Sequence, residues 1–446
     1  MYEISGKLKT FALGLMLIGL VGIAIGFVKG LGATESDAEQ VIEHARELKA
    51  EKAEKEAGKI HYGKIRKWPR KKPVDKELEP DVEHTLHHLH NRPWAAVYTS
   101  LLFFFMVSLL IFVFYAMHKA ASAGWSVVIY RLNEAMSRGM VSLGILLLVF
   151  FVLGAMGVHH LFPWMHAEGD EVLEAKSLWL NIPGWLIRAF IIIGGYMALR
   201  GLIIKKNFEQ DSASDYTPHR KAFRLTIVFI AFFMLTEAVL GWDWLMSLDP
   251  HWFSTLYSWY AFASAMVTGI AVMVLVILYL KGQGYLEYVK DSHLHDLGKY
   301  LFGFSIFWTY LWFSQYMLIW YSNMPEETTY FASRMMHYKS LFLGMIPLNF
   351  ALPVLILMDI EAKRKKALLI ITAILVIIGH YLDFFVMIMP SAVAENWHIG
   401  LPEIGAFLFF AGLFIFCGFT NLTKRPLLPA NNPYLEESKH FHYYNL

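Results

Sequence analysis

The sequence predicts an all-α integral membrane protein with about ten transmembrane helices, and three observations support this. Hydrophobic residues make up 56% of the 446 residues and charged residues only 17%, whereas a typical soluble domain is about a quarter charged. The hydrophobic residues form runs of about 20, the length that a helix needs to cross roughly 30 Å of hydrocarbon. The 14 Trp residues fit aromatic belts at the two membrane interfaces.

The apolar runs place the spans along the chain. Lys7 and Lys9 precede the first run as in a secretory signal, but this run is long for a signal, so we expect an anchor. The expected spans are Phe11–Lys29, Trp94–Met117, Met140–Phe162, Ile182–Ile204, Phe223–Met246, Tyr257–Leu280, Tyr300–Trp320, Leu341–Met358, Ala367–Met389 and Pro402–Thr420.

Lys and Arg are distributed unequally between the two sides of these spans. One side carries basic residues at both termini and in each of its loops, whereas the short loops of the other side carry only Lys176, Arg334 and Lys339. Cytoplasmic loops are enriched in Lys and Arg. We therefore expect a multi-pass membrane protein with both termini in the cytoplasm.

Four prolines suggest how the spans are grouped. Pro163, Pro250, Pro325 and Pro390 follow the outer ends of spans three, five, seven and nine, and proline ends helices. This recurrence predicts two four-helix bundles flanked by extra helices. The expected divisions are a first anchor (1–31), a periplasmic loop with a charged helix (32–93), the first bundle (94–256), the second bundle (257–390), the last helix (391–421) and a cytoplasmic tail (422–446).

The cysteine and histidine content limits the metal chemistry. Cys417 is the only cysteine, whereas iron–sulfur clusters and c-type haem require several thiolates or a Cys-x-x-Cys-His motif. His84, His87 and His88 share one helical face, but no cysteine or carboxylate set completes a zinc site. Haem b needs two facing histidines, and only His380 lies well inside a span. We expect no metal and no covalent cofactor in this chain.

Ionisable residues inside the spans are the first candidates for function, because each costs about 2.5–3.5 kcal/mol at the bilayer centre on insertion scales. One group shares the outer half of the first bundle: His159, His160, Arg188, Glu237 and Asp243. Arg188 could pair with Glu237 or with Asp243 and simply lock the bundle. Histidine and carboxylate groups also suit a quinone site, which needs hydrogen-bond partners and a base.

The second group lies in the second bundle. His380 and Asp383 are three residues apart and therefore share a helical face, which is typical of a proton-relay step. Other polar residues could extend this candidate proton path: Ser305, Tyr310, Gln315 and Asn349. The alternative is a set of interhelical hydrogen bonds, each worth under about 1–2 kcal/mol.

Two segments at the outer edge carry a family resemblance. They are Met246-Ser-Leu-Asp-Pro-His-Trp-Phe-Ser-Thr255 and Ser314-Gln-Tyr-Met-Leu-Ile-Trp-Tyr-Ser-Asn-Met-Pro-Glu-Glu327. With ten spans and no cofactor motif, they resemble the ActF family, the second NrfD-like membrane subunits of bacterial alternative complex III. The resemblance covers roughly span two to span ten.

The resemblance implies a subunit of a menaquinol-oxidising respiratory complex in the bacterial inner membrane. The implied partners are a sister NrfD-like membrane subunit, a periplasmic iron–sulfur subunit, multihaem and monohaem cytochromes c, and in some cases a terminal oxidase. Haem c and iron–sulfur clusters would belong to these partners, and menaquinone would be the one cofactor for this chain. The implied role is quinone interaction, a transmembrane proton path, or both.

Two other functions are compatible with the sequence. A proton-coupled secondary transporter would also bury His, Asp, Glu and Arg, but transporters often break helices near mid-membrane. Here the prolines lie mostly at helix ends, and spans five, seven and nine look continuous. A purely structural membrane anchor would tolerate replacement of His380, Asp383 and Glu237.

Overall fold

The computed structural model describes residues 2–57, 82–165 and 169–443. Over these residues the chain is all-helical, and nine helices are long and apolar enough to span a membrane. The protein is therefore a multi-pass, all-α membrane protein, as the apolar runs predict. Its elements are α1 (Gly6–Leu31), α2 (Glu35–Ala57), α3 (Val82–Ala120), η1 (Gly124–Ile129), α4 (Tyr130–Met136), α5 (Gly139–Ala155), η2 (Pro163–Met165), α6 (Glu171–Ala175), α7 (Ile182–Ser212), α8 (Thr217–Trp244), η3 (Met246–Leu248), α9 (Tyr257–Gly282), α10 (Asp291–Ser322), α11 (Pro325–His337), α12 (Lys339–Ile346), η4 (Pro347–Ala351), α13 (Leu352–Leu357), η5 (Ala362–Arg364), α14 (Lys366–Val393), α15 (Leu401–Leu422) and α16 (Leu435–His440).

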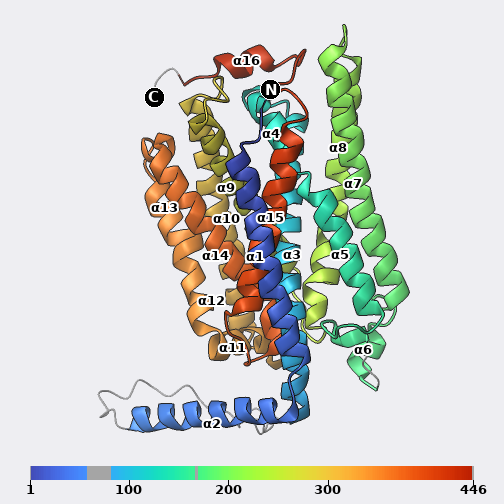
Figure 1. The fold of residues 1–446 in the computed structure, drawn as a ribbon, viewed down its shortest axis with the longest axis vertical. Coiled ribbons are helices and arrows are strands. Elements are labelled where there is room, and N and C mark those ends of the chain that lie inside the picture. Colours follow the sequence, from blue (N-terminus) through green and yellow to red (C-terminus); the bar gives the residue numbers. More distant parts are fainter. Residues whose placement is uncertain (1, 58–81, 166–168, 444–446) are drawn as a thin grey trace.

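Helix α10 contains the seventh expected span but is not among these nine. It is rich in Trp and Tyr, which have low hydropathy, although its 32 residues are ample for a crossing. Both termini lie at the same end of the bundle (Figure 1), which requires an even number of passes. Helix α10 supplies the further pass.

Helix α3 is the centre of the molecule. Its residues from Leu101 to Ala116 are buried on every side, the pattern expected of a helix that is hydrophobic all round. It packs against α1, α5, α8, α9, α14 and α15. No other described span is so completely enclosed by protein.

Two rings of four helices meet at this centre. In the first ring α3 contacts α5, α5 contacts α7, α7 contacts α8, and α8 returns to α3. The second ring closes in the same way: α9 contacts α10, α10 contacts α13, α13 contacts α14, and α14 returns to α9. Figure 1 shows the first ring on the right and the second on the left, with α1 and α15 lying side by side in front of α3.

Several helix boundaries differ from the expectation, and three of them involve a proline or a glycine. The third span was expected to reach Phe162, but α5 ends at Ala155 because Gly157 adopts a left-handed conformation (φ 75°) that stops the helix. Pro390 lies inside α14 rather than beyond it. Helix α3 begins at Val82, twelve residues before the expected start of its span, and continues through Pro93.

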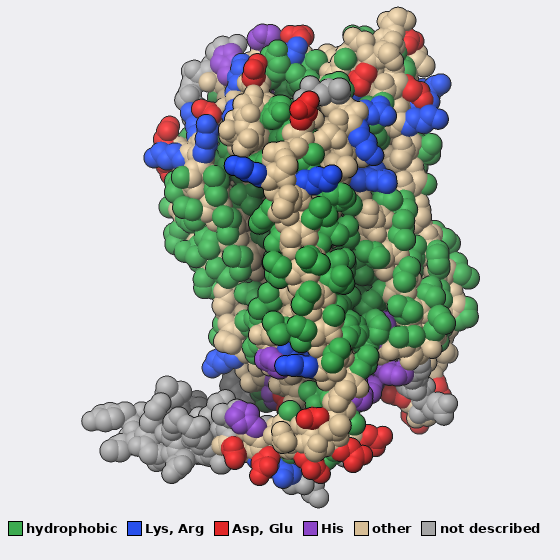
Figure 2. Space-filling view, in the orientation of Figure 1, with side chains coloured by type: hydrophobic (Ala, Val, Ile, Leu, Met, Phe, Trp, Pro, Cys, Tyr) green, Lys and Arg blue, Asp and Glu red, His purple; other side chains and the backbone are tan. Residues whose placement is uncertain are grey.

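The outer loop contains the expected charged helix. Helix α2 runs from Glu35 to Ala57 across the end of the bundle opposite the termini (Figure 1). Ala38 and Ile42 are its buried apolar contacts, and it packs on α3. The remainder of the expected loop, residues 58–81, lies outside the described residues. Figure 2 shows Lys and Arg gathered in a band near the end that carries both termini.

Candidate proton path and quinone cleft

His380 and Asp383 lie fully buried on α14 at the centre of the second ring. His380 Nδ1 is 3.6 Å from Asp383 Oδ2. Ser264 of α9 bridges them, because its hydroxyl lies 2.8 Å from Asp383 Oδ2 and 2.9 Å from His380 Nδ1. Since the hydroxyl has one hydrogen and donates it to the carboxylate, the histidine Nδ1–H donates to Ser264.

Two larger side chains complete the surroundings of Asp383. Tyr260 of α9 donates its hydroxyl to Asp383 Oδ1. Trp308 of α10 donates its indole N–H to Asp383 Oδ2 at 2.8 Å. The ring of Trp308 also meets the imidazole of His380 edge-on, with centroids 5.2 Å apart. Helices α9, α10 and α14 therefore each contribute to one hydrogen-bonded cluster.

Several buried polar atoms near this cluster have no hydrogen-bond partner among the described residues. They belong to the same ring of helices, on α10, η4 and α14: His380 Nε2, Ser305 Oγ, Thr372 Oγ1, Gln315 Nε2 and both amide atoms of Asn349. Buried polar groups are normally hydrogen-bonded, in many cases to internal water. This concentration of open donors and acceptors makes the interior of the second ring suited to holding water molecules.

Asn349 occupies a special backbone position. It lies in η4, a π-helical turn that interrupts the eighth span between α12 and α13. Single π-helical turns inside α-helices are frequent at functional sites. The amide of Asn349 lies directly against Gly379, where a Cβ would come within 1.9 Å of Asn349 Oδ1. The π-turn thus brings Asn349 beside the residue that precedes His380.

The structure contradicts the placement expected for Tyr310. Ser305, Gln315, Asn349, His380 and Asp383 are all buried. Tyr310, by contrast, is 65% exposed on the outer surface of α10. Because it is only two residues from Trp308, it lies on the opposite side of the helix. It does not belong to the interior path.

The first ring carries a second cluster near its outer end. Arg188 of α7 donates two hydrogen bonds to Asp243 of α8, from Nε to Oδ2 at 2.6 Å and from Nη2 to Oδ1 at 3.1 Å. Trp179 donates its indole N–H to Asp243 Oδ1 at 2.8 Å. The guanidinium lies 4.3 Å from the centroid of the Trp179 ring. Of the two expected partners of Arg188, the structure selects Asp243.

A cleft of about 440 Å³ opens beside this cluster. Its lining is mostly aromatic and apolar: Leu178, Trp179, Trp242, Met246, Trp252 and Phe253. Lys176 is the charged residue of the lining, and burial lowers its pKa. An aromatic cleft with a few polar groups at its edge is typical of a site for a flat organic ring.

The other residues of the expected outer-half group lie elsewhere. Glu237 is half-buried further along α8 and makes no hydrogen bond or ion pair with the described residues. His159 and His160 lie beyond the end of α5. His159 is buried and stacks on Phe150, whereas His160 is exposed and approaches Asn91 through its backbone. The five residues do not form one pocket: the early end of α5 places the two histidines in a loop, and on α8 Asp243 rather than Glu237 meets Arg188.

Sequence reasoning missed Tyr260, Ser264 and Trp308, which supply most of the hydrogen bonds to Asp383. Tyr260 and Ser264 are four residues apart on one face of an otherwise apolar span, and this spacing is the signal that could have found them. It also missed Arg92 of α3, whose Nε donates to Glu403 Oε1 at 2.8 Å. Glu403 also accepts a hydrogen bond from the backbone N–H of Gly400 at the start of its own helix, at 2.8 Å.

Comparison with protein-family models and with curated proteins finds no match for this chain.

Proposed function

We propose that the protein is a membrane subunit of a menaquinol-oxidising alternative complex III and that it contributes a transmembrane proton path. The observation that carries the proposal is the buried His380–Asp383–Ser264–Tyr260–Trp308 cluster. The same ring also holds buried polar atoms that have no hydrogen-bond partner among the described residues. Ionisable groups this deep in a membrane protein usually mark proton or substrate pathways.

In this proposal the cluster passes protons between water molecules held along the ring. His380 Nδ1 is engaged with Ser264, so Nε2 is the nitrogen that accepts a proton and releases it again. Asp383 holds the imidazole in this orientation. Asn349, Ser305 and Gln315 extend the path by binding water on either side. Electrons would pass through partner subunits that carry the iron–sulfur clusters and haem c.

The cleft beside Arg188 and Asp243 supports quinone interaction as part of the same function. The flat aromatic walls suit a naphthoquinone ring, and Lys176 and the Trp179 indole lie at the edge of the cleft. The high Lys and Arg content of the termini-bearing end supports a cytoplasmic location for that end. The cleft would then lie on the periplasmic side, where quinol oxidation releases protons outward.

The proposal is tested with Asp383→Asn in the purified complex, reconstituted in liposomes. The substitution keeps the size of the side chain but removes its titration. We expect assembly and haem content to persist, quinol oxidation to continue, and the number of protons moved per electron to fall. Glu361→Gln is the matched control, because Glu361 is an exposed carboxylate in the turn before the same helix. If the number of protons moved per electron is unchanged in Asp383→Asn, the cluster only holds the helices together and does not conduct protons.

One observation favours a proton-coupled transporter as the second candidate. The eighth span is interrupted by the π-turn at Pro347–Ala351, and interrupted helices are common at transporter binding sites. Purification separates the two functions. A preparation coloured by c-type haem supports the respiratory complex, whereas a colourless protein that moves a solute into liposomes along a proton gradient supports transport.

A further inference from the structure

Arg334 of α11 is a buried cation that forms no ion pair with any described residue. It is 2% exposed, and α11 lies near the end of the bundle opposite both termini (Figure 1). Two of its nitrogens donate to backbone carbonyls, those of Tyr330 at 3.1 Å and Met387 at 3.4 Å. Its Nε has no hydrogen-bond partner among the described residues. Burying a charge is costly unless nearby groups compensate it, so we searched its surroundings for the groups that do.

Three buried tyrosines lead from Arg334 towards Asp383. The guanidinium of Arg334 lies over the ring of Tyr330, 3.4 Å from its centroid. The hydroxyl of Tyr330 donates to that of Tyr257 at 3.4 Å. The rings of Tyr257 and Tyr260 are neighbours on α9, with centroids 6.1 Å apart, and Tyr260 donates its hydroxyl to Asp383 Oδ1. These hydroxyl groups therefore continue the buried cluster towards the outer end of the second ring.

Asp249 lies on the outer side of this chain, in the loop between η3 and α9. Its backbone carbonyl accepts a hydrogen bond from the N–H of Trp252 at 3.1 Å, and the ring of Trp252 stacks on Tyr330 with centroids 4.1 Å apart. The half-buried carboxylate makes no hydrogen bond or ion pair with the described residues. Burial raises the pKa of Asp249, and the charge of Arg334 is the largest influence that opposes this rise. Asp249 is therefore close enough to Arg334 to feel its charge without direct contact.

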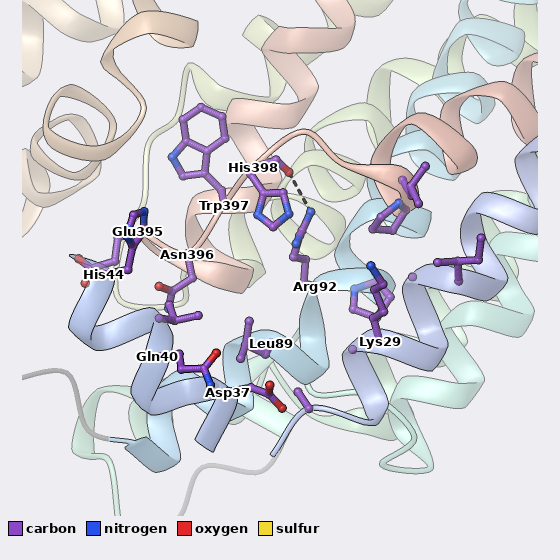
Figure 3. A pocket seen from close by; sticks show the side chains of 18 residues that line it. Lys29, Asp37, Gln40, His44, Leu89, Arg92, Glu395, Asn396, Trp397 and His398 are labelled. Carbon is purple, nitrogen blue, oxygen red and sulfur yellow. Dashed lines mark hydrogen bonds between the residues drawn. The ribbon is translucent and has the colours of Figure 1, made fainter. Parts of the chain in front are cut away.

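The opposite direction from Arg334 leads towards a cavity of about 840 Å³ at the same end of the molecule, with Trp397 in its wall (Figure 3). Tyr338, one helical turn beyond Arg334, stacks on Trp397 with centroids 4.8 Å apart. The hydroxyl of Tyr338 donates to the carbonyl of Ala394 at 2.7 Å, and the indole N–H of Trp397 donates to the carbonyl of His337 at 2.9 Å. Both donors are bound to the backbone, so these two side chains do not extend the tyrosine chain into the cavity.

We propose that Asp249, Tyr330 and Arg334 form the outer outlet of the proton path, an inference that rests on the proton transfer proposed above. A proton from Asp383 enters the tyrosine chain, where each hydroxyl passes on its own proton as it accepts the next, with water bridging the gaps. The carboxylate of Asp249 accepts the proton that leaves the chain and releases it to water, beside the 55% exposed side chain of His251. Arg334 is a positioning residue, whose charge keeps Asp249 ionised between transfers and whose guanidinium holds the ring of Tyr330.

The test compares Asp249→Asn with Asp383→Asn in the purified complex, reconstituted in liposomes. We expect assembly, haem content and quinol oxidation to persist in Asp249→Asn, and the number of protons moved per electron to fall as far as it does in Asp383→Asn. Asp249→Glu restores a carboxylate and should recover the parent ratio. Tyr330→Phe removes one hydroxyl from the chain and should lower the ratio as well. Tyr338→Phe is its matched control, because it removes a buried hydroxyl that is bound to the backbone next to the same helix.

The two proposals fail in different ways. An unchanged ratio in Asp249→Asn beside a lowered ratio in Asp383→Asn overturns the outlet and leaves the proton path standing. An unchanged ratio in both variants overturns the path and the outlet together. Loss of quinol oxidation in Asp249→Asn would overturn the outlet by assigning Asp249 to the quinone cleft. Equal losses in Tyr330→Phe and Tyr338→Phe would overturn it too, because they would reflect damaged packing rather than a missing proton carrier.

Discussion

Asp243 and Asp383 are both fully buried carboxylates, yet their surroundings differ in one decisive respect. Asp243 is bound by a guanidinium, two of whose nitrogens donate to it. Asp383 is bound by a tyrosine, a serine and a tryptophan, none of which carries a full charge at neutral pH. Asp243 is therefore part of an ion pair with a permanently charged guanidinium. Asp383 has no such partner, and the neighbouring His380 is the group that can take up a proton. This contrast supports the proposed proton path in the second ring.

The Arg188–Asp243 pair can be tested by a double-mutant cycle. Arg188→Leu leaves Asp243 with Trp179 as its side-chain partner and should destabilise the protein by about 3 kcal/mol, the lower end for a broken buried pair, because Arg188 retains 21% exposure. Adding Asp243→Asn should recover part of this loss. The measurement is unfolding in mild detergent for both single variants and the double variant. Strictly additive effects would mean that the two side chains do not stabilise each other.

At the scale of helices, the approximate positions of nine spans could be predicted from hydropathy, whereas α10 also required its length and the even number of passes. Their ends could not always be predicted, because Val158, Leu161 and Phe162 extend the apolar pattern past the turn at Gly157 although the helix has already ended. Depth along a helix was predictable, but rotation about its axis was not. That is why Asp243 and Glu237 were equal candidates for Arg188, and why Tyr310 was placed inside the ring.

The contact between α1 and α15 depends on glycines. A Cβ on Gly19 would lie 2.4 Å from the backbone nitrogen of Phe409, whereas a Cβ on Gly14 of the same helix would meet nothing within 4 Å. Small residues allow helices in membranes to approach closely. Gly19→Leu should therefore lower stability by about 1–3 kcal/mol, as expected for overpacking.

Gly14→Leu is the control for this substitution, because it adds the same side chain to α1 at a position facing open space. The melting temperature in mild detergent should fall for Gly19→Leu and stay near the parent value for Gly14→Leu. Equal melting temperatures for the two variants would show that α1 does not depend on this close packing.

At the scale of the whole molecule, α3 belongs to the first ring and packs against α9 and α14 of the second. It therefore lies between the two rings, and its residues from Leu101 to Ala116 are buried on every side. The central position of α3 could have been predicted, because its sequence is apolar on all faces. The position of the buried cluster in the second ring could not, since it depends on which helices bring Tyr260, Ser264 and Trp308 to one carboxylate.

The outer end of the molecule carries a surface that suggests further subunits. Helix α2 buries Ala38 and Ile42 against the protein but exposes Glu35, Glu39 and Glu43. These exposed carboxylates form a charged face on the described part of α2. We therefore expect the protein to be stable as part of a larger assembly whose partners cover this end.

After gentle solubilisation, the particle mass should exceed that of the 446-residue polypeptide by several subunits, and denaturing detergent should release the single chain. A homogeneous particle that contains this polypeptide alone and remains folded would contradict both the assembly and the respiratory function proposed for it.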